Sequence, residues 1–358
     1  MKNLFNEEDW RVLKQRMLES DEERLTISFY KYVHLVNPQF FRDYLFTNWS
    51  RLGVFGRTYV AAEGINAQIS VPRDNYEAFR DHLYSISFLD GIRLNLAVDD
   101  NGKSFYKLVI KVRDKILADG LNDDTFDVTD RGKHLKAAEF NELIERDDTI
   151  VIDMRNHYEH EVGHFRGAYT PDVTTFRDSL AHILENLRGM EDKNIAMYCT
   201  GGIRCEKASA YFKHMGFPHV HQLDGGIIEY ARQVKAQGLE NKFVGKNFVF
   251  DERLGERISD DVISRCHVCG TPCDHHTNCL NKACHVLFIQ CDECSRKLDG
   301  CCSETCREVI HLPEEDQKAI RAGRTRTPDE LYHKGKSPHL KHKTVHKPME
   351  EIRKTVNG

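Results

Sequence analysis

The chain has 358 residues, enough for two or three domains and too many for one small core. About 40% of the residues are hydrophobic and 30% are charged, which is typical of a globular protein in water. No apolar run is long enough to span a bilayer, the N-terminus lacks the order of a signal peptide, and the net charge of −5 does not indicate nucleic-acid binding. We therefore expect a cytoplasmic protein with no membrane-spanning segment.

Residues 1–125 alternate strand-like and helix-like segments. Segments rich in β-branched and aromatic residues predict strands, and segments with helically spaced apolar residues predict helices. Two of the strands are expected to meet around Glu63 and Gly64, because glycine readily takes a positive φ. The order βαββαβ predicts a ferredoxin-like α+β domain. The segments are 25–35, 38–53, 54–71 (two strands), 74–84, 92–98 and 105–112.

A second region, residues 133–240, alternates apolar strands with helices. Strands of this apolar composition are typical of a parallel sheet that is covered on both faces. We therefore expect an α/β domain. Its expected strands are residues 149–154, 194–199 and 219–223, and its expected helices are residues 137–145, 174–187 and 205–215.

The sequence C-T-G-G-I-R-C lies between the strand that ends at Cys199 and the helix that follows. Loop N–H groups, the helix dipole and Arg204 all favour a negative charge on the Cys199 sulfur. We interpret Cys199 as a reactive nucleophile; a buried structural cysteine beside a tight turn is the alternative. The other residues of this active-site loop are Thr200, Gly201, Gly202, Ile203 and Cys205.

The loop resembles the C-x-x-G-x-R loop of rhodaneses, and three further motifs of that superfamily follow the same order. They are D-M-R at 153–155, G-H-F-R-G-A at 163–168 and L-D-G-G-I at 223–227. The resemblance implies that Cys199 carries a persulfide, that Arg204 binds an anion, and that Asp153 and Arg155 support the site. Only four residues separate Cys199 from Arg204, whereas dual-specificity phosphatases have five, so a sulfane sulfur suits the loop better than a phosphate monoester.

Cys205 stands where simple rhodaneses have serine or threonine. A second thiol at this spacing can resolve a disulfide or a sulfenic acid on Cys199. The alternative is a small side chain packed under the helix.

Ten of the 12 cysteines lie between Cys266 and Cys306. Four thiolates hold one tetrahedral Zn²⁺, so these cysteines can hold two structural ions, and a cross-brace in which the first and third pairs share an ion is one arrangement. Metal binding would supply the folding energy that this small segment, residues 241–312, otherwise lacks. The pairs are Cys266/Cys269, Cys279/Cys284, Cys291/Cys294 and Cys302/Cys306. Competing ligands are His267, His276 and His285, and an iron–sulfur cluster or free thiols are the alternatives.

Residues 313–358 are rich in Lys, Arg and His. We expect a flexible basic tail, which either follows a phosphate backbone or serves only as a solvated segment.

Several long motifs occur together in this chain. They are G-R-T-Y-V-A-A-E-G-I-N at 56–66, the Cys199 loop, F-V-F-D-E-R at 248–253, C-H-V-C-G at 266–270 and L-F-I-Q-C-D-E-C at 287–294. Together they resemble the rhodanese-related tRNA uridine hydroxylases. This resemblance implies an enzyme that uses O2 as co-substrate to convert the wobble uridine of tRNA to 5-hydroxyuridine. It implies tRNA as the partner, and we expect no stable protein partner.

Three functions follow from these observations. The first is the hydroxylase, in which Cys199 adds to C6 of a flipped uracil and so activates C5, or in which an oxidised or persulfide form of Cys199 acts directly. The second is a sulfurtransferase that passes persulfide sulfur to an acceptor, and the third is a non-catalytic docking module. Arg57, Glu63 and Asn66 lie near the predicted hairpin, where Asn66 is a candidate RNA contact and ordinary turn residues are the alternative.

Overall fold

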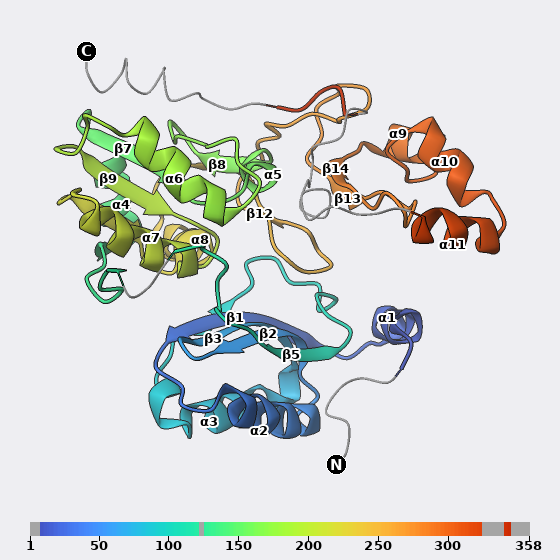
Figure 1. Cartoon of the computed structure of the whole chain (residues 1–358), viewed down its shortest axis with the longest axis horizontal. Helices are drawn as coiled ribbons and strands as arrows, with labels where there is room; N and C mark the ends of the chain where they lie inside the picture. The colour runs from blue at the N-terminus through green and yellow to red at the C-terminus, as the bar shows by residue number, and fades with distance from the viewer. Residues whose placement is uncertain (1–7, 122–124, 324–339, 345–358) are drawn as a thin grey trace.

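The computed structural model describes residues 8–121, 125–323 and 340–344. Figure 1 shows an N-terminal domain (α1 to β5), a central domain (β6 to α8) and a C-terminal region (β13 to α11). No helix in these described ranges is both long and apolar enough to cross a membrane.

The N-terminal domain has one five-stranded sheet in the order β4-β1-β3-β2-β5. The first four strands of this order are antiparallel neighbours, as a ferredoxin-like fold requires, and β5 adds a strand parallel to β2. The predicted α+β fold is confirmed, whereas α1 was not foreseen. Its elements are α1 (Trp10–Glu19), β1 (Arg24–Tyr32), α2 (Pro38–Arg51), β2 (Phe55–Ala61), β3 (Gly64–Pro72), α3 (Tyr76–Tyr84), β4 (Asn95–Leu96) and β5 (Leu108–Val112).

The two faces of this sheet differ in character. Successive residues of a strand point to opposite faces, so Ile27, Phe29 and Ile69 pack with Trp49 of α2 and Phe79 of α3 in one buried cluster. Figure 1 shows α2 and α3 on the side of the sheet remote from the central domain. The other face, which carries more polar residues, is therefore turned toward the central domain.

The central domain contains a parallel sheet in the order β6-β10-β9-β7. Helices α6 and α7 pack on one face and α4 and α8 on the other, which confirms the predicted α/β architecture. The elements are β6 (Lys133–Leu135), α4 (Ala137–Ile144), β7 (Thr149–Asp153), α5 (His157–His160), β8 (Gly163–Phe165), α6 (Phe176–Asn186), β9 (Asn194–Tyr198), α7 (Ile203–His214), β10 (Val220–Leu223) and α8 (Gly226–Gln237).

The chain then returns to the central domain before it enters the C-terminal region. Strand β11 (Phe243–Asn247) pairs antiparallel with β8 and with β12 (Glu256–Arg257). The C-terminal region is a short hairpin with three helices, and its main buried cluster is built largely from cysteines. Its elements are β13 (His276–Asn278), β14 (Leu287–Ile289), α9 (Asp292–Lys297), α10 (Glu304–Ile310) and α11 (Glu314–Ala322).

Part of the predicted flexible tail has defined structure. Helix α11 lies within it and buries no side chain, so its sequence shows no core pattern. Residues 340–344 contact the other regions: Lys341 N–H donates to the His267 carbonyl at 3.0 Å, and Thr344 N–H donates to Glu161 Oε1 at 2.8 Å. Residues 324–339 and 345–358 of this predicted tail lie outside the described residues.

Buried ion pairs join the N-terminal domain to α7. Lys207 Nζ lies 2.7 Å from Glu63 Oε2 and 2.7 Å from Asp119 Oδ2, and its side chain is fully buried. At the other edge of the contact, Arg93 forms a two-point pair with Asp224 at 2.7 and 2.6 Å. These pairs fix the polar face of the sheet over the start of α7.

We expect Lys207→Met to destabilise the protein by up to about 3–5 kcal/mol, because it removes a fully buried cation from Asp119, which keeps its pair with Lys115, and from the partly buried Glu63. Lys213→Met is the matched control, since the Lys213–Asp130 pair lies at the surface, where such pairs contribute about 0–1 kcal/mol. Urea unfolding of the two variants checks this expectation. Equal stability losses would show that the Lys207 cluster does not hold the domains together.

Candidate active site

Cys199 lies directly after β9, at the carboxyl end of the parallel sheet, with 1% of its surface exposed. The loop returns to α7 through Gly202, whose φ of 101° is a left-handed conformation that favours glycine. A side chain at Gly202 would also lie 2.8 Å from the Tyr30 hydroxyl of the N-terminal domain. The Gly202 N–H donates to the Cys199 sulfur at 3.1 Å, so the turn itself provides a donor for the thiolate.

The surroundings of Cys199 favour its ionised form. Burial alone raises the pKa of the thiol. A hydrogen bond from the Cys205 thiol, the charge of Arg204 and the backbone N–H groups of both residues outweigh burial and lower the Cys199 pKa to about 6. The thiol is therefore a thiolate at neutral pH, which is the form that attacks electrophiles.

Cys205 is fully buried at the first turn of α7 and donates toward Cys199. Burial, together with the negative charge on Cys199, raises the pKa of Cys205 well above its usual value. The two thiols therefore form an unequal pair, with the proton held on Cys205. This arrangement is compatible with both sequence interpretations, a resolving thiol and a packed small side chain.

Arg204 has an acidic partner that the sequence interpretation missed. Its guanidinium contacts both oxygens of the fully buried Glu159, with Nη1 at 2.5 Å from Oε2 and Nη2 at 3.1 Å from Oε1. Nη2 also donates to the Thr200 hydroxyl at 3.3 Å. Glu159 closes the capping box of α5 with Asn156, and an acid three residues after an asparagine is the sequence signal that could have found it.

Asp153 and Arg155 form a fully buried pair behind the loop. Arg155 Nη2 lies 2.7 Å from Asp153 Oδ2 and donates to the Gly163 carbonyl at 2.6 Å. Burial works against the Asp153 carboxylate, but the Arg155 charge lowers its pKa below the usual value. Neither residue lines the cavity at Cys199 that the described residues form, so neither contacts a molecule bound there.

A cavity of about 760 Å³ opens between the Cys199 loop and the polar face of the N-terminal sheet. This volume is within the range of about 300–1,000 Å³ that is usual for small-ligand sites. Its walls come from both domains and from the segment after β11. The lining residues that matter here are Ser28, Tyr30, Arg57, Tyr59, Asn66, Gln68, Asn95, Tyr158, Arg177, Cys199, Thr200, Gly201, Ile203, Arg204 and Phe250.

The three hairpin candidates separate in the structure. Arg57 and Asn66 line the cavity, and the Asn66 amide also donates to the Ile116 carbonyl at 3.2 Å. Glu63 instead accepts from the Ile116 N–H at 2.6 Å and pairs with Lys207. Glu63 therefore belongs to the contact between the domains.

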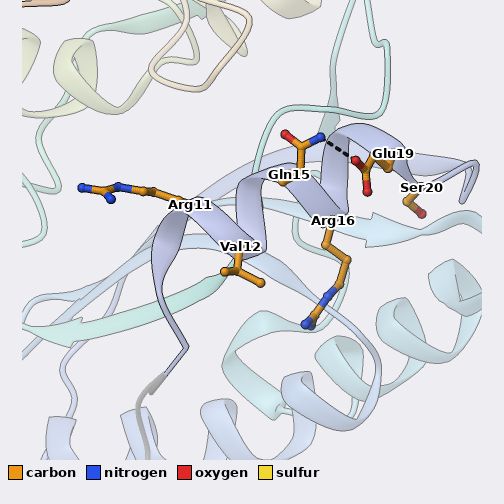
Figure 2. A pocket seen from close by; sticks show the side chains of 6 residues that line it. All are labelled: Arg11, Val12, Gln15, Arg16, Glu19 and Ser20. Atoms are coloured by element: carbon orange, nitrogen blue, oxygen red, sulfur yellow. Dashed lines mark hydrogen bonds between the residues drawn. The ribbon is translucent and has the colours of Figure 1, made fainter.

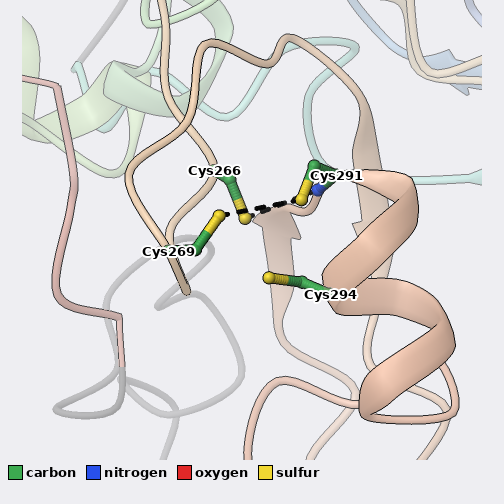
Figure 3. A group of neighbouring side chains, drawn as sticks. All are labelled: Cys266, Cys269, Cys291 and Cys294. Atoms are coloured by element: carbon green, nitrogen blue, oxygen red, sulfur yellow. Dashed lines mark hydrogen bonds between the residues drawn. The ribbon is translucent and has the colours of Figure 1, made fainter.

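Eight cysteines of the C-terminal region form two groups. Within each group the four sulfurs lie within 4.8 Å of one another, and each group joins residues that lie far apart in the chain. Figure 3 shows Cys266 and Cys269 on a loop that faces Cys291 and Cys294 at the start of α9. The groups are Cys266, Cys269, Cys291 and Cys294, and Cys279, Cys284, Cys302 and Cys306. This is the cross-brace arrangement, and each group could hold a metal ion.

The sulfur spacing can be tested against a metal ion. A tetrahedral ion with metal–sulfur bonds of about 2.3 Å places its ligand sulfurs about 3.8 Å apart. The Cys269–Cys291 and Cys284–Cys302 sulfurs are 3.7 Å apart, and the Cys302–Cys306 sulfurs are 3.8 Å apart. The competing ligand His267 instead contacts Glu161 Oε1 at 2.9 Å.

A further hollow lies along α1, remote from this chemistry. Figure 2 shows its lining side chains, among which Gln15 donates to Glu19 Oε1 at 2.5 Å. The other lining residues are Arg11, Val12, Arg16 and Ser20. No cysteine or histidine among the described residues lines this hollow, and we assign no function to it.

Three family descriptions match successive parts of the chain. Residues 24–116 match the "UPF0176 acylphosphatase like domain", residues 136–233 the "Rhodanese-like domain" and residues 244–307 the "Rhodanase C-terminal" description. The fold and the Cys199 loop thus define a protein of the rhodanese superfamily with an acylphosphatase-like N-terminal domain.

Two relatives match almost the whole chain. A protein of Photorhabdus laumondii is 58% identical over 322 residues, which is 90% of this chain and 92% of its own length. A protein of Cronobacter sakazakii is 59% identical over 313 residues, which is 87% of this chain and 90% of its own length. Both are named tRNA uridine(34) hydroxylase. The chain therefore belongs to the tRNA uridine(34) hydroxylase family.

The pKa of Cys199 can be measured through its reactivity. We expect alkylation of Cys199 by iodoacetamide to rise with pH through a midpoint of about 6 and to level off above it, because the thiolate is the reactive form. Arg204→Met should move the midpoint upward, since a positive charge is lost, and Arg204→Lys should move it less. Mass spectrometry of the Cys199 peptide follows the reaction.

Two further variants complete this measurement. Cys205→Ala should also raise the midpoint, whereas Cys205→Ser keeps a donor and should raise it less. Arg188→Met is the control, because Arg188 is an exposed arginine of the same domain. A wild-type midpoint at the ordinary thiol value of about 8.5 would contradict the electrostatic description of the loop.

Proposed function

We propose that this chain hydroxylates the wobble uridine of tRNA to 5-hydroxyuridine in an O2-dependent reaction, with Cys199 as the reacting residue. The observation that carries the proposal is the position of the Cys199 thiol, whose surroundings lower its pKa to about 6, in a cavity of about 760 Å³ walled by two domains. Two relatives that this chain matches over nearly their whole length are named tRNA uridine(34) hydroxylase, which supports the same conclusion. A wobble base lies in a single-stranded loop, so turning it into a cavity costs little free energy.

The thiolate gives the reaction a route that needs no resident redox cofactor. Addition of the Cys199 sulfur to C6 of uracil raises the electron density at C5, which then takes one oxygen atom from O2. The second oxygen atom leaves as water, and this step consumes two electrons and two protons from an external reductant. Loss of the C5 proton and expulsion of the Cys199 thiolate restore the uracil double bond. Arg204, held in place by Glu159, keeps positive charge beside the sulfur throughout.

Sulfur transfer is the second candidate function. The N–H donors around the Cys199 sulfur would also stabilise a persulfide, which favours this chemistry. A simple sulfurtransferase, however, needs only the central domain and gives no role to the cavity wall formed by the N-terminal sheet. We therefore place the hydroxylase first and propose that a persulfide, where it forms, is carried on Cys199.

We also propose that the C-terminal region binds two zinc ions, one in each cysteine group. Thiolates are soft ligands suited to zinc, and four of them make a closed site that leaves no position for a substrate. The role of the ions is then structural, because metal binding supplies folding free energy to a region with little other core.

The purified protein should contain two zinc ions per chain, one for each group, when measured by elemental mass spectrometry. Cys294→Ser and Cys306→Ser should each remove one ion, since each variant opens a different group. Cys273→Ser and Cys301→Ser are the matched controls, because these cysteines lie outside both groups and should leave both ions bound. Full zinc content in the Cys294→Ser and Cys306→Ser variants would contradict the assignment. Iron in the purified protein, with visible absorbance, would show that the cysteines hold an iron–sulfur cluster and not zinc.

The function is tested by mass spectrometry of tRNA nucleosides from cells that lack this gene and are complemented with wild type, Cys199→Ala or Cys273→Ser. We expect wild type and Cys273→Ser to restore 5-hydroxyuridine derivatives and Cys199→Ala to restore none. An unchanged nucleoside profile in the deletion strain, with no redundant route present, would leave sulfur transfer as the leading function. Full restoration by Cys199→Ala would exclude both thiol mechanisms.

A further inference from the structure

A row of polar side chains crosses the N-terminal sheet from one strand to the next. Ser28 of β1 pairs with Asn95 of β4 on one side and with Gln68 of β3 on the other, and Gln68 pairs in turn with Arg57 of β2. Directly paired residues point to the same face of a sheet. The four side chains therefore form one row, Asn95–Ser28–Gln68–Arg57, which we call the polar row.

The polar row faces the Cys199 loop. All four residues line the 760 Å³ cavity, together with Cys199 and Thr200. At one end of the row, Ser28 Oγ and Asn95 Nδ2 each lie 4.0 Å from the place that a Cβ on Gly201 would occupy. The row begins beside the reactive loop at its buried end, Asn95, and runs outward to the exposed Arg57.

The row has hydrogen-bonding capacity that the protein does not use. Asn95 is 4% exposed, and its Oδ1 has no partner among the described residues. No group in the described ranges of the chain hydrogen-bonds the half-buried Gln68 side chain either, although the neighbouring Asn66 amide is bound to the Ile116 carbonyl. Buried polar groups are nearly always paired in folded proteins, so the unpaired Asn95 oxygen indicates a polar ligand, and the half-buried Gln68 amide is free to bind the same ligand.

We propose that the polar row reads the Watson–Crick edge of the target uracil, with Gln68 as the central contact and Arg57 as the contact to a backbone phosphate. This inference rests on the proposed function and names the residues that position its substrate. The uracil edge presents an acceptor at O4, a donor at N3 and an acceptor at O2. The carboxamides of Gln68 and Asn95 offer both kinds of partner.

This orientation also brings the reacting atom to Cys199. In the pyrimidine ring, N3 lies diametrically opposite C6. A base held by its N3 edge on the sheet therefore presents C6 to the opposite wall of the cavity, where the Cys199 loop lies. The aromatic side chains Tyr59 and Phe250 line the same cavity and offer surfaces on which a base can stack.

The test is binding of an anticodon stem-loop RNA that carries either uridine or 3-methyluridine at the wobble position. Methylation removes the N3 donor, and Gln68→Met removes the protein partner while nearly keeping its volume. We expect methylation to weaken binding to wild type by about tenfold, the size of one lost hydrogen bond, and to have a much smaller effect in Gln68→Met. Gln39→Met, on the exposed surface of α2, is the control and should behave as wild type.

The result that overturns the inference is an equal effect of methylation in wild type and Gln68→Met, because a merely structural role of Gln68 gives additive losses. Equal binding of the uridine and 3-methyluridine RNAs by wild type would also overturn the inference. Arg57→Ala should weaken both RNAs alike and reduce the slope of log Kd against log salt by about 0.7, the value for one phosphate contact on a single strand. An unchanged slope would remove Arg57 from the assignment.

Product formation is measured on the same proteins, so the two proposals fail separately. If wild type shows the coupling between Gln68 and N3 but makes no 5-hydroxyuridine, the proposed function is wrong and the base-reading row stands. If wild type makes the product and shows no coupling, the row is wrong and the function stands.

Discussion

The structure depends most on how a negative charge is kept on the sulfur of Cys199, a residue that is almost fully buried. A charge in such a place costs a large amount of free energy unless fixed dipoles and opposite charges replace the lost water. At Cys199 the replacement consists of the Gly202 N–H, the first N–H groups of α7, the Cys205 thiol and Arg204. All of these belong to a loop of seven residues, so the position of the turn decides the chemistry.

The cation at the site requires a compensating charge of its own. Arg204 is nearly buried, and Glu159 neutralises it through contacts to both carboxylate oxygens. The same principle recurs where the N-terminal domain meets α7, since Lys207 is balanced by two carboxylates, one of which comes from the β2–β3 hairpin. Because buried charges must be paired, Arg204 and Lys207 of α7 together set the position of the reactive loop and of the N-terminal domain that covers it.

The sequence alone predicted what local patterns encode. The strand that ends before Cys199, the paired glycines and the following helix are written in consecutive residues, and the spacing of the cysteine pairs shows that sulfur ligands are available. The sequence could not show which distant residues would meet. Glu159 lies 45 positions before Arg204, and Glu63 lies 144 positions before Lys207, so only the tertiary fold pairs them.

The polar row could not be predicted from the sequence for the same reason, because its four residues come from four strands whose register is set by the fold. The sequence placed Glu63 near the predicted hairpin without giving it a partner, whereas its contact with Lys207 decides its role.

The cysteine-rich region is connected to the active loop by a continuous series of contacts. His267 lies between two cysteines of the first group and contacts Glu161, which follows α5 directly. Helix α5 carries Glu159, the partner of Arg204. The backbone of Thr344 donates to the same Glu161 oxygen, so the C-terminal segment reaches this point as well. Helix α5 is therefore contacted at two points: His267, between two cysteines of the first group, binds Glu161 at its end, and Arg204 of the active loop binds Glu159 within it. A structural metal ion at that group would fix α5 and with it Glu159, the carboxylate that positions Arg204 beside Cys199. This gives the C-terminal region a physical reason to accompany the rhodanese-like domain.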